Sequence, residues 1–119
     1  MNELFDAHNR ERLSRGLPAQ SQDERLNAAA QKHAEWMQSR RRMSHRGAGF
    51  SSPAQRIAAE GYRFASIAEN VAAGQTSVAQ VMAAWMRSRG HRNNILGRNR
   101  EIGLGRAGNY WCVVFGTQR

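Results

Sequence analysis

The sequence contains one cysteine, Cys112, and this scarcity limits the chemistry that the chain can perform. A lone thiol cannot form a disulfide within the chain, and zinc sites built on paired cysteines are excluded. A metal site would therefore have to use mainly histidine and carboxylate ligands. The sequence also lacks any apolar run near the roughly 18 residues that a membrane-spanning helix needs, so no such helix is predicted.

Acidic residues are scarce relative to basic ones, 9 against 18, and the formal net charge is +9. All basic side chains except Lys32 are arginine. Arginine binds carboxylates, phosphates and aromatic faces well, so anionic partners are one interpretation of this composition. A GC-rich genome is the other interpretation, because it favours arginine codons without any functional consequence.

The length of 119 residues predicts a single domain over residues 1–119 with a hydrophobic core of its own. The chain begins Met1-Asn2-Glu3-Leu4-Phe5, which is helix-like and has no charged-then-apolar leader. Either the protein is cytoplasmic or a secretory signal has been removed from it. The residues leave both locations open.

Serine-led caps predict three helix starts, at about residues 22, 53 and 78. The cap sequences are Ser21-Gln22-Asp23-Glu24, Ser52-Pro53-Ala54-Gln55 and Ser77-Val78-Ala79-Gln80. A further helix is predicted from Asn2 to a glycine stop at Gly16. Apolar stripes at helical spacing predict which helix sides face the core. The stripes are Leu26, Ala29, Ala30, His33 and Met37, and Val78, Val81, Met82 and Trp85.

Three segments have the composition of strands: Phe64–Val71, Glu101–Arg106 and Tyr110–Thr117. Only Ala107-Gly108-Asn109 separates the last two, which is short enough for a hairpin. The order of elements predicts an α+β fold with a small, largely antiparallel sheet. Four helices are too many for one face of such a sheet, so we expect helices on both faces.

Two of the four histidines are expected to have structural roles. His33 lies on the apolar stripe of its helix, and a core histidine is the favoured interpretation. His8 lies in the middle of the opening helix beside Asn9 and Arg12. We expect this group to hydrogen-bond to neighbouring segments of the chain.

His45 and His91 are instead predicted in glycine-containing loops directly after helix ends, where a rigid scaffold often presents functional groups. In the second of these loops, SRGHRNNIL, the glycine is expected to end the preceding helix. The pleat of the predicted strand places Glu69 on the same face as Ile67 and Val71. An unpaired buried carboxylate is unfavourable, and two imidazoles would supply its partners.

Motifs along almost the whole chain resemble the CAP superfamily, which comprises cysteine-rich secretory proteins, antigen 5 and pathogenesis-related 1 proteins. The similarity is to its short bacterial SCP-like branch, and it rests on the order and spacing of the motifs together. The motifs are His8-Asn9-x-x-Arg12, Met43-Ser44-His45, Gly61-Tyr62, Ala68-Glu69-Asn70-Val71-Ala72, Ala84-Trp85-Met86-x-Ser88-x-Gly90-His91-Arg92, Asn94-Ile95-Leu96, Ile102-Gly103-Leu104-Gly105 and Tyr110-Trp111.

The resemblance implies an α-β-α sandwich, an extracellular or periplasmic location, and a cleft that holds divalent metal in some relatives. His45, Glu69 and His91 match three positions of the family's four-residue site. Ser88 stands where longer relatives carry a glutamate, so zinc binding is expected to be weak. The side chains expected around these ligands are Ser88, Asn70 and Asn94.

The sequence favours a secreted binding module for a divalent metal, a small polar ligand or a lipid. A hydrolase that uses the same cleft is the second possibility, with metal-activated water or with Ser88 activated by His91. We expect a monomer.

Adhesion to an anionic polymer or membrane surface is the third possibility, and it depends on an arginine cluster. Its members are Arg40, Arg41, Arg42 and Arg46. A second cluster is formed by Arg87, Arg89, Arg92, Arg98 and Arg100. Aromatic residues are not interleaved with these arginines, so the sequence does not indicate specific nucleic-acid binding.

Overall fold

The molecule is organised around a four-stranded sheet with the strand order β1-β3-β4-β2. A computed structural model describes residues 2–119. The strands are β1 (Ser21–Gln22), β2 (Phe64–Ala73), β3 (Glu101–Ala107) and β4 (Tyr110–Gln118). The short β1 pairs with β3 in parallel, whereas the β3–β4 and β2–β4 pairs are antiparallel. The sheet is therefore largely antiparallel, and the predicted hairpin joins β3 to β4.

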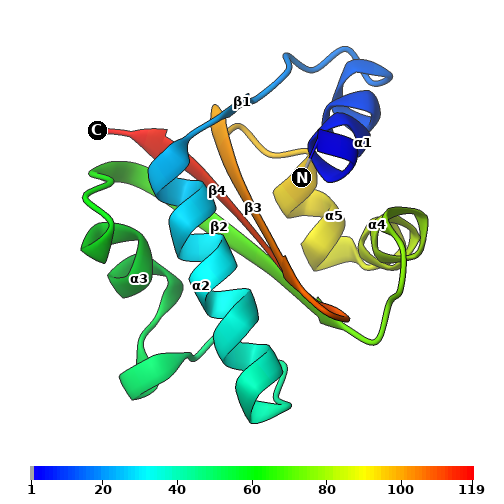
Figure 1. Ribbon diagram of the computed structural model, residues 1–119. Helices are drawn as coiled ribbons and strands as arrows, with labels where there is room; N and C mark the ends of the chain where they lie inside the picture. The colour runs from blue at the N-terminus through cyan, green and yellow to red at the C-terminus, as the bar shows by residue number, and fades with distance from the viewer. Residues whose placement is uncertain (1) are drawn as a thin grey trace.

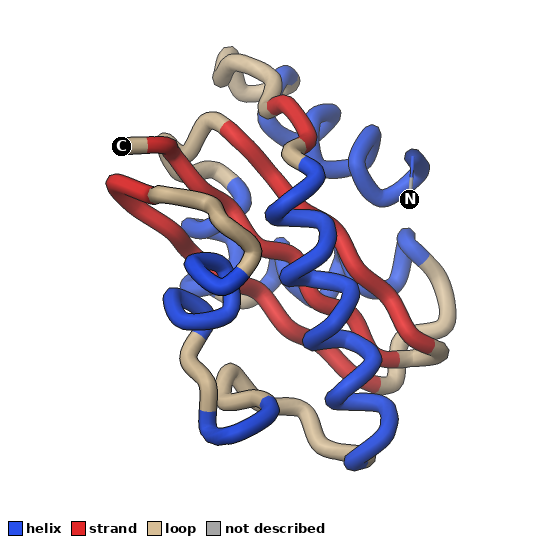
Figure 2. The backbone as a smooth tube through the Cα atoms, turned by 60° about the vertical axis from the view of Figure 1, so that its left-hand side comes forward, coloured by secondary structure: helices blue, strands red, loops and turns tan. Residues whose placement is uncertain are grey.

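Helices cover both faces of this sheet (Figures 1 and 2). One face carries α2 (Glu24–Arg40) and α3 (Pro53–Ala59), which are joined through a single 3-10 turn, η1 (Ala48–Phe50). The other face carries α1 (Asn2–Leu13), α4 (Val78–Arg87) and α5 (Arg89–Ile95). The predicted α+β class and α-β-α sandwich are confirmed. No helix within residues 2–119 is long and apolar enough to cross a membrane.

The alternation of side chains along β4 divides the core into two parts. Trp111, Val113 and Phe115 pack with the helices α1, α4 and α5. Cys112 and Val114 face the opposite way and pack with α2 and α3. Every residue of the α2 stripe is buried, as predicted, and so is the α4 stripe apart from the half-buried Val78.

Helix α2 lies directly against β3, and the sequence permits this close approach through two glycines. A methyl group on Gly103 would overlap the Leu26 carbonyl, and one on Gly105 would lie 2.5 Å from the Ala30 carbonyl carbon. The short β1 covers only the start of β3. Side-chain amides of α2 bind the rest of that edge, because Asn27 accepts from the Leu104 N–H at 2.9 Å and Gln31 accepts from the Arg106 N–H at 2.9 Å.

The start of α2 differs from the prediction. Ser21 was expected to cap this helix, but Ser21–Gln22 forms β1 and Asp23 is the N-cap. The Asp23 carboxylate accepts hydrogen bonds from the backbone N–H groups of Arg25 and Leu26. A carboxylate satisfies the free N–H groups of a first turn as well as a serine does, and this frees the serine to pair with β3. The predicted cap at Ser52 is confirmed as a capping box with Gln55.

The stretch around Gly90 also differs from the prediction. Gly90 was expected to end the helix after Trp85, but α4 ends at Arg87, and the next residue, Ser88, is extended with φ −101° and ψ 120°. Helix α5 begins immediately afterwards and contains both Gly90 and His91. One extended residue is enough to separate the two helices, so His91 belongs to a helix and not to a loop.

Candidate functional site

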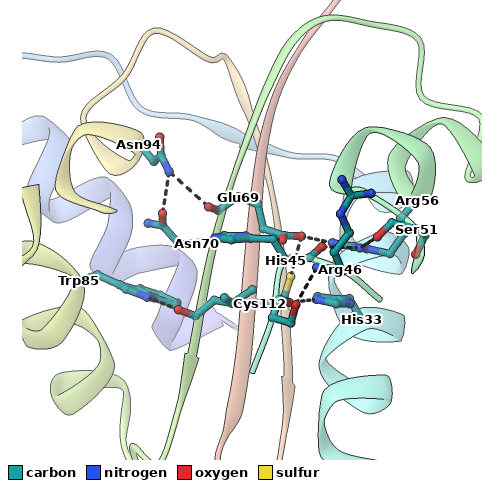
Figure 3. Close-up of polar contacts among 12 residues, drawn as sticks. His33, His45, Arg46, Ser51, Arg56, Glu69, Asn70, Trp85, Asn94 and Cys112 are labelled. Carbon is teal, nitrogen blue, oxygen red and sulfur yellow. Dashed lines mark hydrogen bonds and ion pairs between the residues drawn. The ribbon is translucent and has the colours of Figure 1, made fainter. Parts of the chain in front are cut away.

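Glu69 is the buried charge around which the candidate site is built. It lies on the edge strand β2, and its side chain is only 2% exposed. One carboxylate oxygen, Oε1, lies 2.9 Å from Nδ1 of His45, and the other, Oε2, accepts from Nη2 of Arg56 at 2.6 Å (Figure 3). The thiol of Cys112 lies 3.5 Å from Oε2. The predicted buried carboxylate is therefore partnered by one imidazole and one guanidinium, not by two imidazoles.

Arg56 on α3 is a site residue that the sequence did not single out. Its guanidinium bonds to Glu69 and also donates from Nη1 to the carbonyls of His45 at 2.9 Å and Ser51 at 2.8 Å. It therefore fixes the loop at His45 and at Ser51. No local motif marks this arginine, because its partners are 5 to 13 residues away in sequence.

His45 lies in the loop after α2, as predicted, and its side chain is 56% exposed. The hydrogen bond to Glu69 raises the pKa of His45, and this effect outweighs partial desolvation. Because Nδ1 faces the carboxylate, the ring's other nitrogen, Nε2, is the atom left for a ligand. Carboxylate–histidine pairs of this kind orient the ring and increase the basicity of the free nitrogen.

His91 is held by different contacts. Its Nδ1 lies 2.9 Å from the Ser88 hydroxyl, and its backbone carbonyl accepts from the Asn70 side chain at 3.0 Å. Desolvation lowers the pKa of His91, and the charge of His45 lowers it further. The positive charge of His45 therefore disfavours a second positive charge on His91. Within residues 2–119, however, no hydrogen bond joins His91 to His45 or Glu69.

Asn70 and Asn94 attach α5 to the edge strand. Asn70 is fully buried and points to the face opposite Glu69 (Figure 3). Asn94 donates to the Asn70 side chain at 2.8 Å and to the Glu69 carbonyl at 3.3 Å. Both of these Asn94 contacts are with β2. The two amides therefore fix the helix that carries His91.

His33 is buried, as the sequence predicted, and His8 is buried as well. His33 donates from Nε2 to the Ser44 carbonyl at 2.7 Å, so this core residue also positions the loop that carries His45. Burial lowers the pKa of His33. His8 donates to the Leu4 carbonyl at 2.8 Å, and burial lowers its pKa to about 4. Both rings therefore remain neutral at physiological pH.

The ligand set for a metal ion is small. Among residues 2–119, no group of three or more His, Cys, Asp or Glu side chains is arranged to hold a metal. Both oxygens of Glu69 already have partners. Within residues 2–119, Nε2 of His45 and Nε2 of His91 have no hydrogen-bond partner, and Nδ1 of each ring contacts Glu69 or Ser88 respectively.

With this geometry in place, the chain can be compared with known proteins. A sequence model of the Cysteine-rich secretory protein family, CAP, matches residues 5–115. The chain belongs to this family. The protein YkwD of Bacillus subtilis, which is uncharacterized, is 34% identical over 115 residues. That alignment covers 94% of this CAP chain but 45% of YkwD, so the chain spans less than half of that relative.

Solved structures confirm the fold of this CAP domain. An extracellular protein containing an SCP domain from Bacillus anthracis has a TM-score of 0.95 at 24% identity, with 99% of this chain and 40% of that chain covered. An outer surface protein of Borrelia burgdorferi has a TM-score of 0.93 at 23% identity, covering 100% of this chain and 92% of that one. At these identities the likeness establishes the fold alone.

The Glu69–His45 contact predicts how His45 titrates. Replacing Glu69 by glutamine removes the carboxylate that stabilises the charged ring, so we expect the pKa of His45 to fall from above 6.5 to near or below it. In the wild type, the contact contributes stability that is fully present below pH 6.5 and is lost as the pH rises through the raised pKa. Ring-proton NMR titration of wild type and Glu69→Gln measures both values. An identical His45 pKa in the two proteins would show that the carboxylate does not control this ring, and His8 serves as the unaffected control.

Proposed function

We propose that this domain is an extracellular binding module whose ligand, a divalent metal ion or a small polar molecule, is held by His45 and His91. The observation that carries the proposal is the exposed His45 ring on a buried carboxylate. A surface histidine needs no such partner for folding. Relatives named as extracellular and outer surface proteins support the location.

The residues fit zinc as an open site with few ligands. Neutral imidazole nitrogen is a good zinc ligand. Structural zinc sites use four protein ligands, which are mainly cysteine sulfurs and histidine nitrogens. Here two imidazoles are present, and water would complete the coordination shell. The Arg56 guanidinium neutralises Glu69, which reduces the electrostatic attraction of the site for a cation. We therefore expect zinc to bind weakly, and the apo protein to stay folded because both core clusters are independent of the metal.

The principal test is zinc titration calorimetry on untagged protein. We expect His91→Ala and His45→Ala each to weaken zinc binding at least about tenfold, because each removes one of two nitrogen ligands. Binding should strengthen as the pH rises through the raised pKa of His45, since zinc competes with the proton on that ring. Asn93→Ala, an exposed substitution on the same helix, is the control and should leave binding unchanged. Zinc uptake unaffected by either histidine substitution, or unfolding on chelation, would refute the assignment.

A hydrolase is the second candidate, and one contact favours it. The Ser88 hydroxyl lies 2.9 Å from Nδ1 of His91, which is the distance required between a nucleophile and its base. Within residues 2–119, however, no carboxylate bonds to His91 to orient it as a base. Ser88 also lies only three residues from His91, at the junction of two helices, where a local contact is common. We therefore favour binding over catalysis.

A further inference from the structure

The loop between α2 and α3 exposes large apolar side chains to solvent. Phe50 is 84% exposed and Met43 is 55% exposed. Among residues 2–119, the one other large hydrophobic side chain with comparable exposure is Leu13. Figure 1 places η1, which ends at Phe50, and the C-terminal end of α2 at the same end of the molecule. This apolar exposure is therefore concentrated at one end.

The backbone holds Phe50 in an unusual conformation. Its φ is +60°, in the left-handed region that bulky side chains rarely adopt, and Gly49 before it has a φ of +63°. A left-handed aromatic residue costs on the order of 1 kcal/mol or more, and such strain persists where the surrounding structure imposes it. This strained conformation does not bury the ring. It instead directs the Phe50 side chain toward solvent.

Buried side chains anchor this loop to the body of the domain. His33 binds the Ser44 carbonyl, and Arg56 binds the carbonyls of His45 and Ser51 (Figure 3). Gly47 lies against the His33 ring, where a Cβ would come within 2.8 Å of Nδ1. The exposed tip is therefore carried by a fixed base, which lowers the entropy lost when the tip binds a partner.

The arginine cluster predicted from the sequence surrounds this tip. Its members, Arg40, Arg41, Arg42 and Arg46, are all exposed, and within residues 2–119 none of them forms a salt bridge. Three of these arginines line a surface hollow of about 500 Å³ together with Trp36, Met43 and Phe50. Arg46 donates to the Phe50 carbonyl at 3.2 Å and Arg40 lies over the Trp36 ring, but within residues 2–119 no carboxylate neutralises these arginines. Positive charge without a carboxylate partner thus lies next to exposed apolar side chains.

We propose that this loop docks the domain on a bilayer that contains anionic phospholipids. Phe50 and Met43 would enter the headgroup region, and the arginines would bind lipid phosphates. A soluble polyanion could use the arginines, but it offers nothing apolar for Phe50 and Met43 to contact. A membrane surface supplies both chemistries, and each arginine near such a surface adds to the attraction.

Vesicle sedimentation tests the proposal with three matched variants. We expect binding to vesicles of phosphatidylcholine with about 30% phosphatidylglycerol, and little binding to phosphatidylcholine alone, because the anionic lipid supplies the negative surface potential. Phe50→Ser should weaken the partition at least about tenfold. The double variant Arg40→Ser/Arg42→Ser should weaken it about thirtyfold. All replaced side chains are exposed, so these variants should unfold at the wild-type temperature.

The double variant Arg98→Ser/Arg100→Ser is the control for net charge, because it removes the same charge from exposed positions outside the loop. An equal loss in this control would overturn the proposal by showing that net charge alone drives binding. Unchanged binding of Phe50→Ser would also overturn it. Retention on heparin without binding to anionic vesicles would identify a polyanion as the partner and exclude the bilayer. None of these outcomes depends on zinc, so the test is independent of the proposed ligand cleft.

Discussion

Gly103→Ala is expected to destabilise the folded chain by at least about 3 kcal/mol, which is the upper range for overpacking a core. The added methyl group would overlap the backbone carbonyl of Leu26 on α2. Backbone cannot move aside as a side chain can, so α2 would have to lift off β3. Urea unfolding followed by tryptophan fluorescence measures the change.

Two further alanine substitutions define the specificity of this effect. Gly105→Ala should be similarly destabilising, because its methyl group would lie 2.5 Å from the Ala30 carbonyl carbon. Gly90→Ala is the control, since nothing lies within 4 Å of its Cβ position and the residue is helical. It should be neutral or slightly stabilising. A Gly103→Ala protein within about 0.5 kcal/mol of wild type, the range of ordinary surface substitutions, would contradict the close approach of α2 to β3.

Arg12→Ala is expected to cost about 3 kcal/mol, because it leaves buried carbonyls without donors. Arg12 is 2% exposed and donates to the carbonyls of Pro18 at 2.9 Å, Ile95 at 2.9 Å and Gly97 at 2.7 Å. It therefore ties α1 to the end of α5, the helix that carries His91. The favourable dipole at that helix end adds to the interaction.

The measurement for Arg12 is the same urea titration, with two comparisons. Arg12→Lys should lose less than Arg12→Ala, because an ammonium group keeps the charge but cannot reach all three carbonyls in the geometry of a guanidinium. Arg10→Ala, at an exposed position of the same helix, should change the unfolding free energy by less than about 0.5 kcal/mol. Equal stability of the two alanine variants would show that the carbonyls find water when Arg12 is removed.

Most of the fold could be predicted from the sequence because its signals are local. The Ser52 cap, the α2 stripe and the β3–β4 hairpin each depend on residues within about one element of each other. The errors occur where two local signals compete. Ser21 and Asp23 are both good caps, and the choice between them depends on the pairing of β1 with β3, about 80 residues later. No local pattern in a single sequence indicates this strand pairing.

In the candidate site, too, the features with local signals could be predicted and those that depend on distant residues could not. The position of Glu69 on an apolar strand face follows from the alternation of β2, and its pairing with His45 was anticipated. The role of Arg56 was not anticipated, because no local pattern distinguishes it from the other arginines of this basic chain. His91 was placed in a loop because Gly90 was interpreted as a helix stop, whereas the extended Ser88 interrupts the helix first.

The burial of Cys112 has a consequence for how copies of this chain behave in an oxidising environment. The side chain is fully buried beneath α2, and burial raises the pKa of its thiol, so almost no thiolate is present to react. Oxidants outside a cell link exposed lone cysteines of neighbouring molecules into covalent dimers. Here such linkage must wait until α2 separates from the sheet. The rate of linkage therefore depends on how often the core opens, as well as on the oxidant.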